Sequence, residues 1–487
     1  MANPFFRTKS IAQILADCDR PEHRLKRSLT VWDLTMLGIG AIVGTGIFVL
    51  IGTAIVGDAN RPGAGPGIIL SFVLSGITCA LAALCYAELA SMIPAAGSAY
   101  TYSYATLGEF LAWITGWNLI LEYGVACVAV AIGWSGYFNN VLKMVGIVLP
   151  AWATRAPGGP DGGVMNLPAA VIVLLVTWVL VIGIKESART TGVIVCVKLA
   201  VILFFIAVGL SSVEPANWTP FMPYGFAGVG AAAAVVFFAY IGFDAVSTTA
   251  EESRNPQRDL PIGIIASLAV CTVLYVTVAA VLTGIVPYNK VDIHAPVAEA
   301  LQMAGFKWGA ALVAVGAVAG ITSVLVVMML GQIRVFFAMS RDRLLSPALS
   351  KVHPRYGTPH LATIITGVAV AIMSAFVQIG EAADMTNIGT LFAFVLVCGG
   401  LLVLRKTMPN YPRPFRTPFM PWTPILAIGA CLGLMAFLPW VTWIRFAVWS
   451  IVGVAVYLWY GKRHSRLATE AAPAPFKPDP RRTGALP

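Results

Sequence analysis

The sequence predicts an all-α integral membrane protein with twelve transmembrane helices. Of its 487 residues, 58% are hydrophobic and only 11% are charged, whereas a typical soluble domain has about 25% charged residues. Long apolar runs recur along the whole chain, and most reach the roughly 20 residues that an α-helix needs to cross a bilayer. This composition excludes a soluble enzyme built around one large core.

Twelve apolar runs are present, and we expect one transmembrane helix in each. They begin near residues 32, 67, 109, 166, 190, 227, 261, 309, 361, 385, 420 and 440. Lys and Arg gather in the two tails and in the loops that fall on the same side of this arrangement. The positive-inside rule therefore predicts that both termini are cytoplasmic. The net charge of +10 then reflects membrane topology and not a nucleic-acid partner.

The tails and spans divide the chain into five parts. These are a basic cytoplasmic tail (1–31), two groups of five helices (32–212 and 213–404), helices 11 and 12 (405–461), and a C-terminal cytoplasmic tail predicted to be disordered (462–487). In both groups the first helix is irregular and the third is the longest. Each group holds an odd number of helices, so the second must insert upside down, which predicts an inverted 5+5 repeat.

The first predicted helix contains an unusual run of glycines at positions 38, 40, 44 and 46. Glycine disfavours the helical conformation because it gains backbone freedom when the helix unwinds. Within hydrocarbon, unpaired peptide groups are tolerated only where they line a cavity inside the protein. We therefore expect this helix to be broken near its centre, with close helix packing at small residues as the alternative.

The sixth predicted helix has a similarly irregular centre at Phe237–Asp244. Interrupted helices at corresponding positions of two repeats indicate the binding site of a transporter. The helix half that begins near Thr45 would offer free amides and a positive dipole end to a carboxylate. Carbonyl groups at that break and around Phe238–Ile241 would accept hydrogen bonds from an ammonium group. The pattern thus predicts a site for a free amino acid.

Among the charged residues of the predicted spans, three lie well inside the apolar runs: Glu122, Lys198 and Asp244. A charged group at mid-bilayer costs ~3 kcal/mol or more, so each is a candidate for function. We expect Lys198 to face the bundle interior, where its ammonium could replace a sodium ion and exchange a proton; snorkelling to the surface is the alternative. Glu122 could balance that charge or border the substrate. Asp244 could take part in proton coupling or cap the break in the sixth helix.

Four segments resemble the amino acid–polyamine–organocation superfamily, and within it the cationic amino acid transporter family. They read GIGAIVGTGIF, YAELASMIPAAGSAYTYSY, FFAYIGFDAVSTTAEESRNPQRDLP and GQIRVFFAMSRDRLL. The resemblance covers about residues 25–460. It implies a LeuT-like 5+5 inverted repeat with helices 1 and 6 broken, and proton-driven amino acid uptake in the bacterial members. Animal members have fourteen spans, so twelve favour a bacterial protein.

The resemblance also implies roles for single residues. The amides of Thr45 and Gly46 would bind the substrate carboxylate, and four carbonyl groups would bind its ammonium: those of Ile42, Phe238, Ala239 and Ile241. Lys198 would match the lysine that such transporters place at the vacated sodium site. Glu122 and Met328 would border the side-chain pocket. The thioether of Met328 would shorten this pocket, so arginine is expected to fit poorly.

We therefore predict a proton-coupled symporter of the cell (inner) membrane that imports small neutral or cationic L-amino acids by alternating access. An amino acid exchanger of the same fold is the alternative. A membrane enzyme or a channel fits less well, because the sequence contains no metal-binding cluster, nucleophile motif, phosphate loop or ring of charges. The expected partners are a free amino acid, a proton and the lipid bilayer, without a cofactor or metal. The sequence neither predicts nor excludes a small membrane subunit as a further partner.

Overall fold

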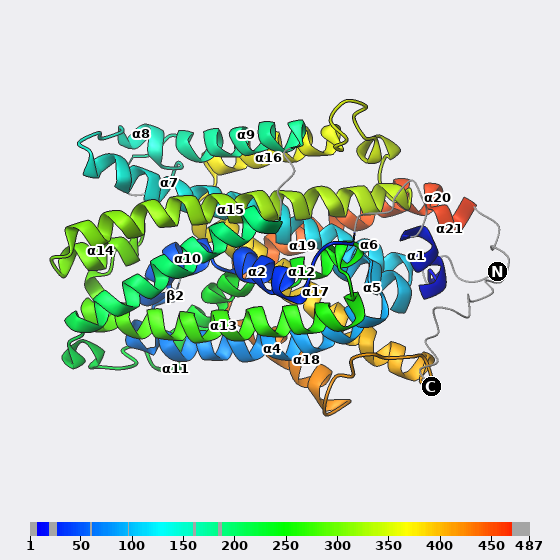
Figure 1. The fold of residues 1–487 in the computed structure, drawn as a ribbon, viewed down its shortest axis with the longest axis horizontal. Coiled ribbons are helices and arrows are strands. Elements are labelled where there is room, and N and C mark those ends of the chain that lie inside the picture. Colours follow the sequence, from blue (N-terminus) through cyan, green and yellow to red (C-terminus); the bar gives the residue numbers. More distant parts are fainter. Residues whose placement is uncertain are drawn as a thin grey trace.

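The structure, a computed structural model, describes residues 7–18, 27–58, 61–95, 97–158, 162–183 and 188–469. In these residues the chain is predominantly helical, and the long helices run side by side in one bundle (Figure 1). The described strands form one small antiparallel hairpin, in which Gly57–Asp58 (β1) pairs with Arg61–Pro62 (β2). Gly57 lies opposite Pro62, and Asp58 lies opposite Arg61.

By length and composition, nine helical segments of the described chain can cross a membrane. They are Val31–Val56, Gly65–Met92, Glu109–Met144, Gly192–Ser212, Gly225–Thr248, Pro256–Ile285, Lys307–Arg341, Ile379–Thr407 and Trp440–His464. Three shorter apolar helices lie between them: Leu167–Ile182, His360–Phe376 and Trp422–Ala436. Together these segments occur at the places of the twelve predicted spans.

The principal helices have the following bounds: α1 Ile11–Cys18, α2 Val31–Ile42, α3 Ile51–Val56, α4 Ile68–Met92, α5 Ser98–Thr106, α6 Glu109–Leu119, α7 Ala126–Met144, α9 Leu167–Ile182, α10 Ala188–Gly209, α11 Gly225–Val236, α12 Ala245–Thr248, α13 Pro256–Ile285, α14 Pro296–Met303, α15 Lys307–Arg341, α16 His360–Phe376, α17 Ile379–Thr407, α18 Trp422–Ala436, α19 Trp440–Val456, α20 Lys462–His464 and α21 Arg466–Thr469. Helix α13 packs against both α2 and α4. On its other side α2 contacts α10 and α15.

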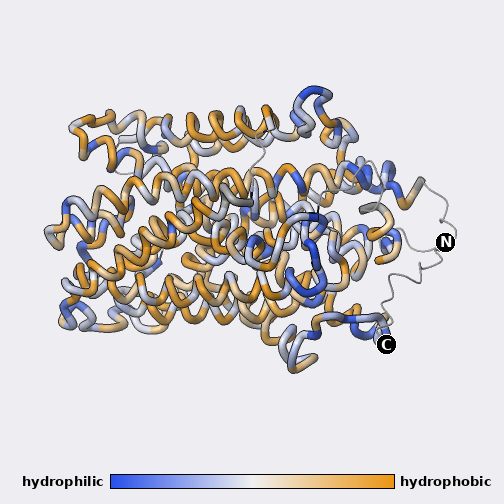
Figure 2. The backbone as a smooth tube through the Cα atoms, in the orientation of Figure 1, coloured by the Kyte–Doolittle hydropathy of each residue, from blue (hydrophilic) through white to orange (hydrophobic). Residues whose placement is uncertain are grey.

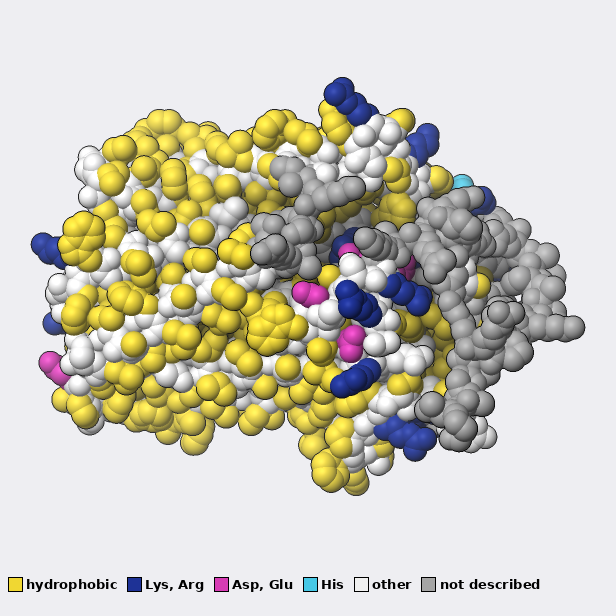
Figure 3. All heavy atoms as spheres, in the orientation of Figure 1, with side chains coloured by type: hydrophobic (Ala, Val, Ile, Leu, Met, Phe, Trp, Pro, Cys, Tyr) yellow, Lys and Arg dark blue, Asp and Glu magenta, His cyan; other side chains and the backbone are white. Residues whose placement is uncertain are grey.

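The outside of the bundle is apolar along the length of the helices. Large hydrophobic side chains such as Trp178 on α9 and Ile451 on α19 are 63% and 67% exposed. Figure 2 shows hydrophobic residues along the helices and hydrophilic ones mainly in the loops at the ends. Most Lys and Arg on the face seen in Figure 3 gather toward the end that carries α1 and α20. We call this the basic end. Such continuous apolar exposure is typical of a surface that lies in lipid.

Helix α2 begins at a capping box, in which Thr30 and Asp33 exchange side-chain and backbone hydrogen bonds. It stops at Val43, where ψ is 101° and the backbone is extended. Helical structure resumes with a π-helical turn, η2 (Gly46–Leu50), that leads into α3. The first membrane-length segment is therefore interrupted within the run of glycines.

A second interruption follows α11. The chain tightens into a 3₁₀ turn, η7 (Phe237–Tyr240), and Ile241 is extended with ψ of 133°. Gly242 then takes a φ of +120°, which side chains with a Cβ strongly disfavour. The short helix α12 starts only after Asp244. The chain therefore changes direction locally between two helical pieces of one membrane-length segment.

A third irregularity lies between α6 and α7, where residues Ile120–Val125 form a π-helical turn, η4. Such turns are rare within α-helices and are frequent at functional sites. This turn carries Glu122, which is fully buried. The long helix α15 packs against both α7 and η4. The three irregular turns are thus enclosed by long, regular helices.

Candidate functional site

The interruption after α2 and the interruption after η7 are in direct contact. A Cβ atom placed on Gly46 would lie 2.2 Å from Cα of Ala239. A Cβ atom placed on Gly242 would lie 3.0 Å from the carbonyl carbon of Ala41. Since real Cβ atoms do not approach main-chain atoms so closely, only glycine fits at Gly46. Main chain therefore meets main chain at the centre of the bundle.

Tyr275 of α13 joins the two interruptions. Its hydroxyl lies 2.9 Å from the carbonyl oxygen of Ile42 and 3.1 Å from that of Ala239. A tyrosine hydroxyl has one proton, so it can donate a full hydrogen bond to only one of these carbonyl groups at a time. Each carbonyl oxygen has two lone pairs and can accept a second donor, such as an ammonium group.

Lys198 of α10 holds the end of α2. Its side-chain ammonium donates to the carbonyl oxygens of Gly40 at 2.8 Å and Val43 at 3.1 Å, and the residue is 1% exposed. The ammonium therefore lies inside the bundle and does not snorkel to the surface. The last carbonyl groups of a helix lack partners within the helix, and a cation is favourable there. Lys198 supplies both the missing donors and the positive charge.

Glu122 and Asp244 form a second buried polar group. Neither carboxylate oxygen of Glu122 has a hydrogen-bond partner among the described residues. One carboxylate oxygen of Asp244 accepts a hydrogen bond from the Tyr123 hydroxyl, and the two carboxyl groups lie close enough to interact electrostatically. Burying two carboxylates without a cation is costly. The pair therefore favours a bound proton or a cationic group from a ligand.

The alternative role of Asp244, as a cap of the helix that follows the second interruption, is not seen for α12. Asp244 does occupy the residue before α12, but its side chain makes no capping hydrogen bond. Its carboxylate instead reaches the hydroxyl of Tyr123 on η4. The reason is that a partner from another helix is available at this position, which local sequence cannot show.

Thr45 lies in the gap between α2 and η2 and is 1% exposed. Its methyl group packs closely on Gly133 of α7, where an added Cβ would lie 2.5 Å away. The Thr45 hydroxyl has no hydrogen-bond partner in the described part of the chain. Phe238 and Ile241 are buried in the other interruption, and the Phe238 carbonyl accepts from the Ile241 amide at 3.2 Å.

Met328 lies on the face of α15 that passes the first interruption. Val324, one turn before it, packs on Gly44, where an added Cβ would lie 2.8 Å from Val324. Gly320, two turns before it, contacts the aliphatic part of Lys198. Residues at these spacings share one helix face. Met328 is buried, at 3% exposed, and follows these contacts along the same stripe.

Sequence reasoning missed three residues: Tyr275, Tyr123 and Gln332. Gln332 of α15 is 1% exposed, and both polar atoms of its amide lack partners among the described residues. It faces η4, because a Cβ on Gly124 would lie 3.1 Å from its Oε1 atom. An amide within an apolar span is a signal that could have identified Gln332. The two tyrosines give no such signal, since tyrosine is common in apolar helices.

Ion pairs join segments at both ends of the bundle. At the end that carries the hairpin, the guanidinium of Arg61 lies 2.7 Å from the carboxylate of Asp384. At the basic end, Arg334 pairs with Glu252 at 3.1 Å, and Lys9 pairs with Asp342 at 3.0 Å. These ion pairs therefore join segments that are far apart in the sequence, at each end of the bundle.

Residues 29–461 match the sequence profile of the amino acid permease family. The chain is 52% identical over 470 residues to the branched-chain amino acid permease BcaP of Bacillus subtilis, covering 96% of this chain and 100% of that protein. It is 50% identical over 443 residues to a methylthioribose transporter of the same organism, covering 91% and 95%. It is 41% identical over 396 residues to the vacuolar cationic amino acid transporter 2 of Arabidopsis thaliana, covering 80% of this chain and 61% of the plant protein.

The contact between Gly46 and Ala239 predicts that Gly46→Ala disables the protein. Forcing a methyl group into this space should cost ~1–3 kcal/mol in the packed arrangement, and binding of a small ligand there should weaken by about tenfold or more. The measurement is uptake of radiolabelled amino acids by proteoliposomes. The control is Gly429→Ala on α18, where an added Cβ meets nothing within 4 Å. Equal uptake by the two variants would contradict the arrangement.

The position of Tyr275 predicts a defect in ligand binding when only its hydroxyl is removed. Tyr275→Phe should weaken ligand affinity by about threefold to tenfold, since one hydrogen bond contributes ~0.5–1.5 kcal/mol. Tyr457→Phe is the matched control, because it removes a hydroxyl that donates to Glu109 at 3.0 Å, away from the interruptions. Both variants should lose some thermal stability. Unchanged affinity in Tyr275→Phe would show that the hydroxyl only supports folding.

Proposed function

Because the chain belongs to the amino acid permease family, we propose that it imports a free L-amino acid across the cell membrane together with a proton, by alternating access. The family and the named relatives identify the chain as a multi-pass membrane transporter of amino acids and not an enzyme. The observation that carries the proposal is the meeting of two helix interruptions, whose main-chain groups are held by Tyr275 and Lys198.

The proposed site uses main-chain groups to bind the two charges that every amino acid shares. The amides of Thr45 and Gly46 begin the helical piece η2–α3, so they would face the substrate carboxylate. Four carbonyl groups from the two interruptions would accept hydrogen bonds from the substrate ammonium: those of Ile42, Phe238, Ala239 and Ile241. The contacts of Tyr275 with two of these carbonyl groups support the arrangement, since they leave further lone pairs free.

We propose branched-chain or other neutral aliphatic amino acids as the substrates. The name of the 52% identical relative supports this choice, and so does the buried thioether of Met328 on the helix face beside the interruption. A cationic amino acid is the second candidate. It is favoured by the buried carboxyl groups of Glu122 and Asp244, which have no cation among the described residues, and by the name of the plant relative.

Proton coupling is proposed to act through Lys198, with Glu122 and Asp244 as a second group. When protonated, Lys198 holds two carbonyl groups at the end of α2 with a full positive charge. Loss of the proton would remove that charge and weaken its hold on α2. A cycle of protonation would thus couple the position of α2 to the proton gradient. An exchanger would use the same site without this step.

The membrane arrangement is proposed to be a LeuT-like inverted repeat of residues 32–212 and 213–404, with helices 1 and 6 broken. The interruptions lie in the first membrane-length segment of each half, which supports this repeat. All twelve apolar helices would cross the membrane. The gathering of Lys and Arg at the basic end supports a cytoplasmic location for that end and for both termini (Figure 3).

Replacing Lys198 tests the coupling. Lys198→Met should abolish uptake driven by a pH gradient into empty proteoliposomes, while substrate still raises the thermal stability of the purified variant. Lys290→Met, at an exposed position in the loop after α13, is the control and should transport normally. Gradient-driven uptake by Lys198→Met would remove its coupling role. Uptake by the natural chain only into vesicles preloaded with amino acid would instead identify an exchanger.

Shortening Met328 tests the substrate assignment. Met328→Ser removes the thioether and should shift the preference from leucine or valine toward longer or cationic side chains by about tenfold, because such side chains would fill the vacated space. The readout is the ratio of leucine to lysine uptake in one preparation, so expression level cancels. An unchanged ratio in a variant that still transports would place Met328 outside the substrate site.

A further inference from the structure

An apolar groove of about 420 Å³ runs along the outside of the bundle between α4 and α13. Small residues leave this space open, among them Gly76 and Ala80 on α4 and Ala269 on α13. Ala80 and Ala269 are exposed, one on each wall. Thr272 is its one polar side chain. Such a groove, on a surface that lies in lipid, fits an extended hydrocarbon chain.

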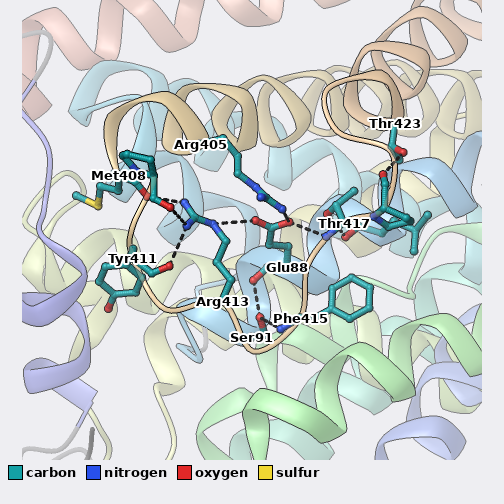
Figure 4. Close-up of polar contacts among 12 residues, drawn as sticks. Glu88, Ser91, Arg405, Met408, Tyr411, Arg413, Phe415, Thr417 and Thr423 are labelled. Atoms are coloured by element: carbon teal, nitrogen blue, oxygen red, sulfur yellow. Dashed lines mark hydrogen bonds and ion pairs between the residues drawn. The ribbon is translucent and has the colours of Figure 1, made fainter.

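The loop 408–421 between α17 and α18 crosses the end of this groove. The Thr417 hydroxyl donates to the carbonyl oxygen of Leu84, which belongs to the groove wall, at 3.0 Å. One turn further along α4, Glu88 accepts a hydrogen bond from the Thr417 amide at 2.7 Å (Figure 4). The loop is therefore anchored to α4 where the groove reaches the basic end.

The same loop is organised around one buried carboxylate and two guanidinium groups. Glu88 is fully buried and pairs with Arg405 at 2.7 Å and with Arg413 at 3.2 Å (Figure 4). Arg413 also donates to the carbonyl oxygens of three loop residues: Met408, Pro409 and Tyr411. One negative charge cannot balance two positive ones, so the cluster keeps an excess positive charge. The loop around it is held in a defined shape.

Two exposed arginines lie beyond the end of the groove. One belongs to the loop that is anchored to α4, and the other belongs to α13. Arg416 precedes Thr417 in the loop, and Arg258 lies in the first turn of α13. Arg258 precedes the groove residues Ile265 and Ala269 by seven and eleven positions, so all three share one face of α13. Neither arginine has a carboxylate partner within the described residues.

Two exposed aromatic residues follow Arg416 in the sequence. Phe419 is 83% exposed and Trp422 is 65% exposed, both a few residues after Arg416. Tryptophan side chains settle at the level of the lipid headgroups, because the indole ring is apolar and carries one polar N–H group. They would place the two arginines at the height of the phosphate groups, directly beyond the hydrocarbon depth of the groove.

We propose that this groove and its two arginines form a binding site for an anionic phospholipid. One acyl chain would lie between α4 and α13, and the phosphate would lie between Arg258 and Arg416. The groove alone gives a hydrocarbon chain little advantage over bulk lipid. Selectivity therefore comes from the arginines, which bind phosphate oxygens in bidentate fashion and prefer a headgroup without a compensating positive charge.

A lipid in this site would contact two helices that border the interruptions, α4 at the second and α13 at the first. The floor of the groove reaches the second interruption, because a Cβ on Gly76 would lie 3.0 Å from the Tyr240 hydroxyl. The other wall, α13, carries Tyr275 and packs against α2. The bound lipid would therefore restrain α4 relative to α13, and its loss should alter both thermal stability and transport.

The headgroup contact can be tested by native mass spectrometry of the purified full-length protein with phosphatidylglycerol or phosphatidylcholine. The natural chain should retain phosphatidylglycerol preferentially, and Arg258→Gln/Arg416→Gln should reduce that retention by about tenfold or more. Lys290→Gln/Lys307→Gln removes the same charge from exposed positions in the loop after α13 and at the start of α15, and should change nothing. Equal retention by the two double variants would overturn the proposal.

The acyl-chain contact needs a separate variant. Ala80→Phe/Ala269→Phe fills the groove from exposed positions and should lower phosphatidylglycerol retention without lowering thermal stability in detergent alone. Ala447→Phe, at an exposed position on α19, is the control and should retain lipid normally. Stabilisation by inorganic phosphate equal to that by phosphatidylglycerol would exclude a role for the acyl chain. A small protein that copurifies and is lost from the groove-filled variant would also overturn the proposal.

Discussion

Peptide groups buried in hydrocarbon need hydrogen-bond partners, and this constraint governs the centre of the molecule. Where α2 ends, its carbonyl groups lose their partners within the helix. The protein supplies substitutes from other helices: the ammonium of Lys198 for Gly40 and Val43, and the hydroxyl of Tyr275 for Ile42. Because these partners come from α10 and α13, the irregular main chain exists only in the assembled bundle.

The same constraint explains why three irregular turns cluster. The two interruptions touch through Gly46 and Ala239, and the π-helical turn η4 places Glu122 beside Asp244 at the second interruption. Each turn departs from regular helical hydrogen bonding, and each is shielded from lipid by its neighbours. Long regular helices such as α13 and α15 provide that shield and carry the side chains that satisfy the main chain. Regular helices therefore support the irregular turns, which are the segments that we propose bind the substrate.

The apolar runs, the sequence motifs and the run of glycines made much of this architecture predictable. Apolar runs predicted where the membrane-length helices lie, and the motifs identified the family correctly. The glycines predicted the region where α2 ends, since a break in lipid needs both flexibility and close approach. What sequence could not provide were partners from distant segments. The Tyr123 hydroxyl donates to the Asp244 carboxylate from another helix. The Tyr275 hydroxyl reaches the carbonyl groups of Ile42 and Ala239, which lie 233 and 36 positions earlier in the sequence. Only the folded bundle brings these groups together.

Tyr275 has one hydroxyl proton for two carbonyl groups, and this imbalance has a mechanical consequence. In this structure the two interruptions share a single donor, so it cannot give a full hydrogen bond to both carbonyl groups at once. If the two helices separate, the proton can stay with either partner, and the total number of hydrogen bonds changes little. The shared hydroxyl can therefore follow either interruption without leaving its own proton unpaired.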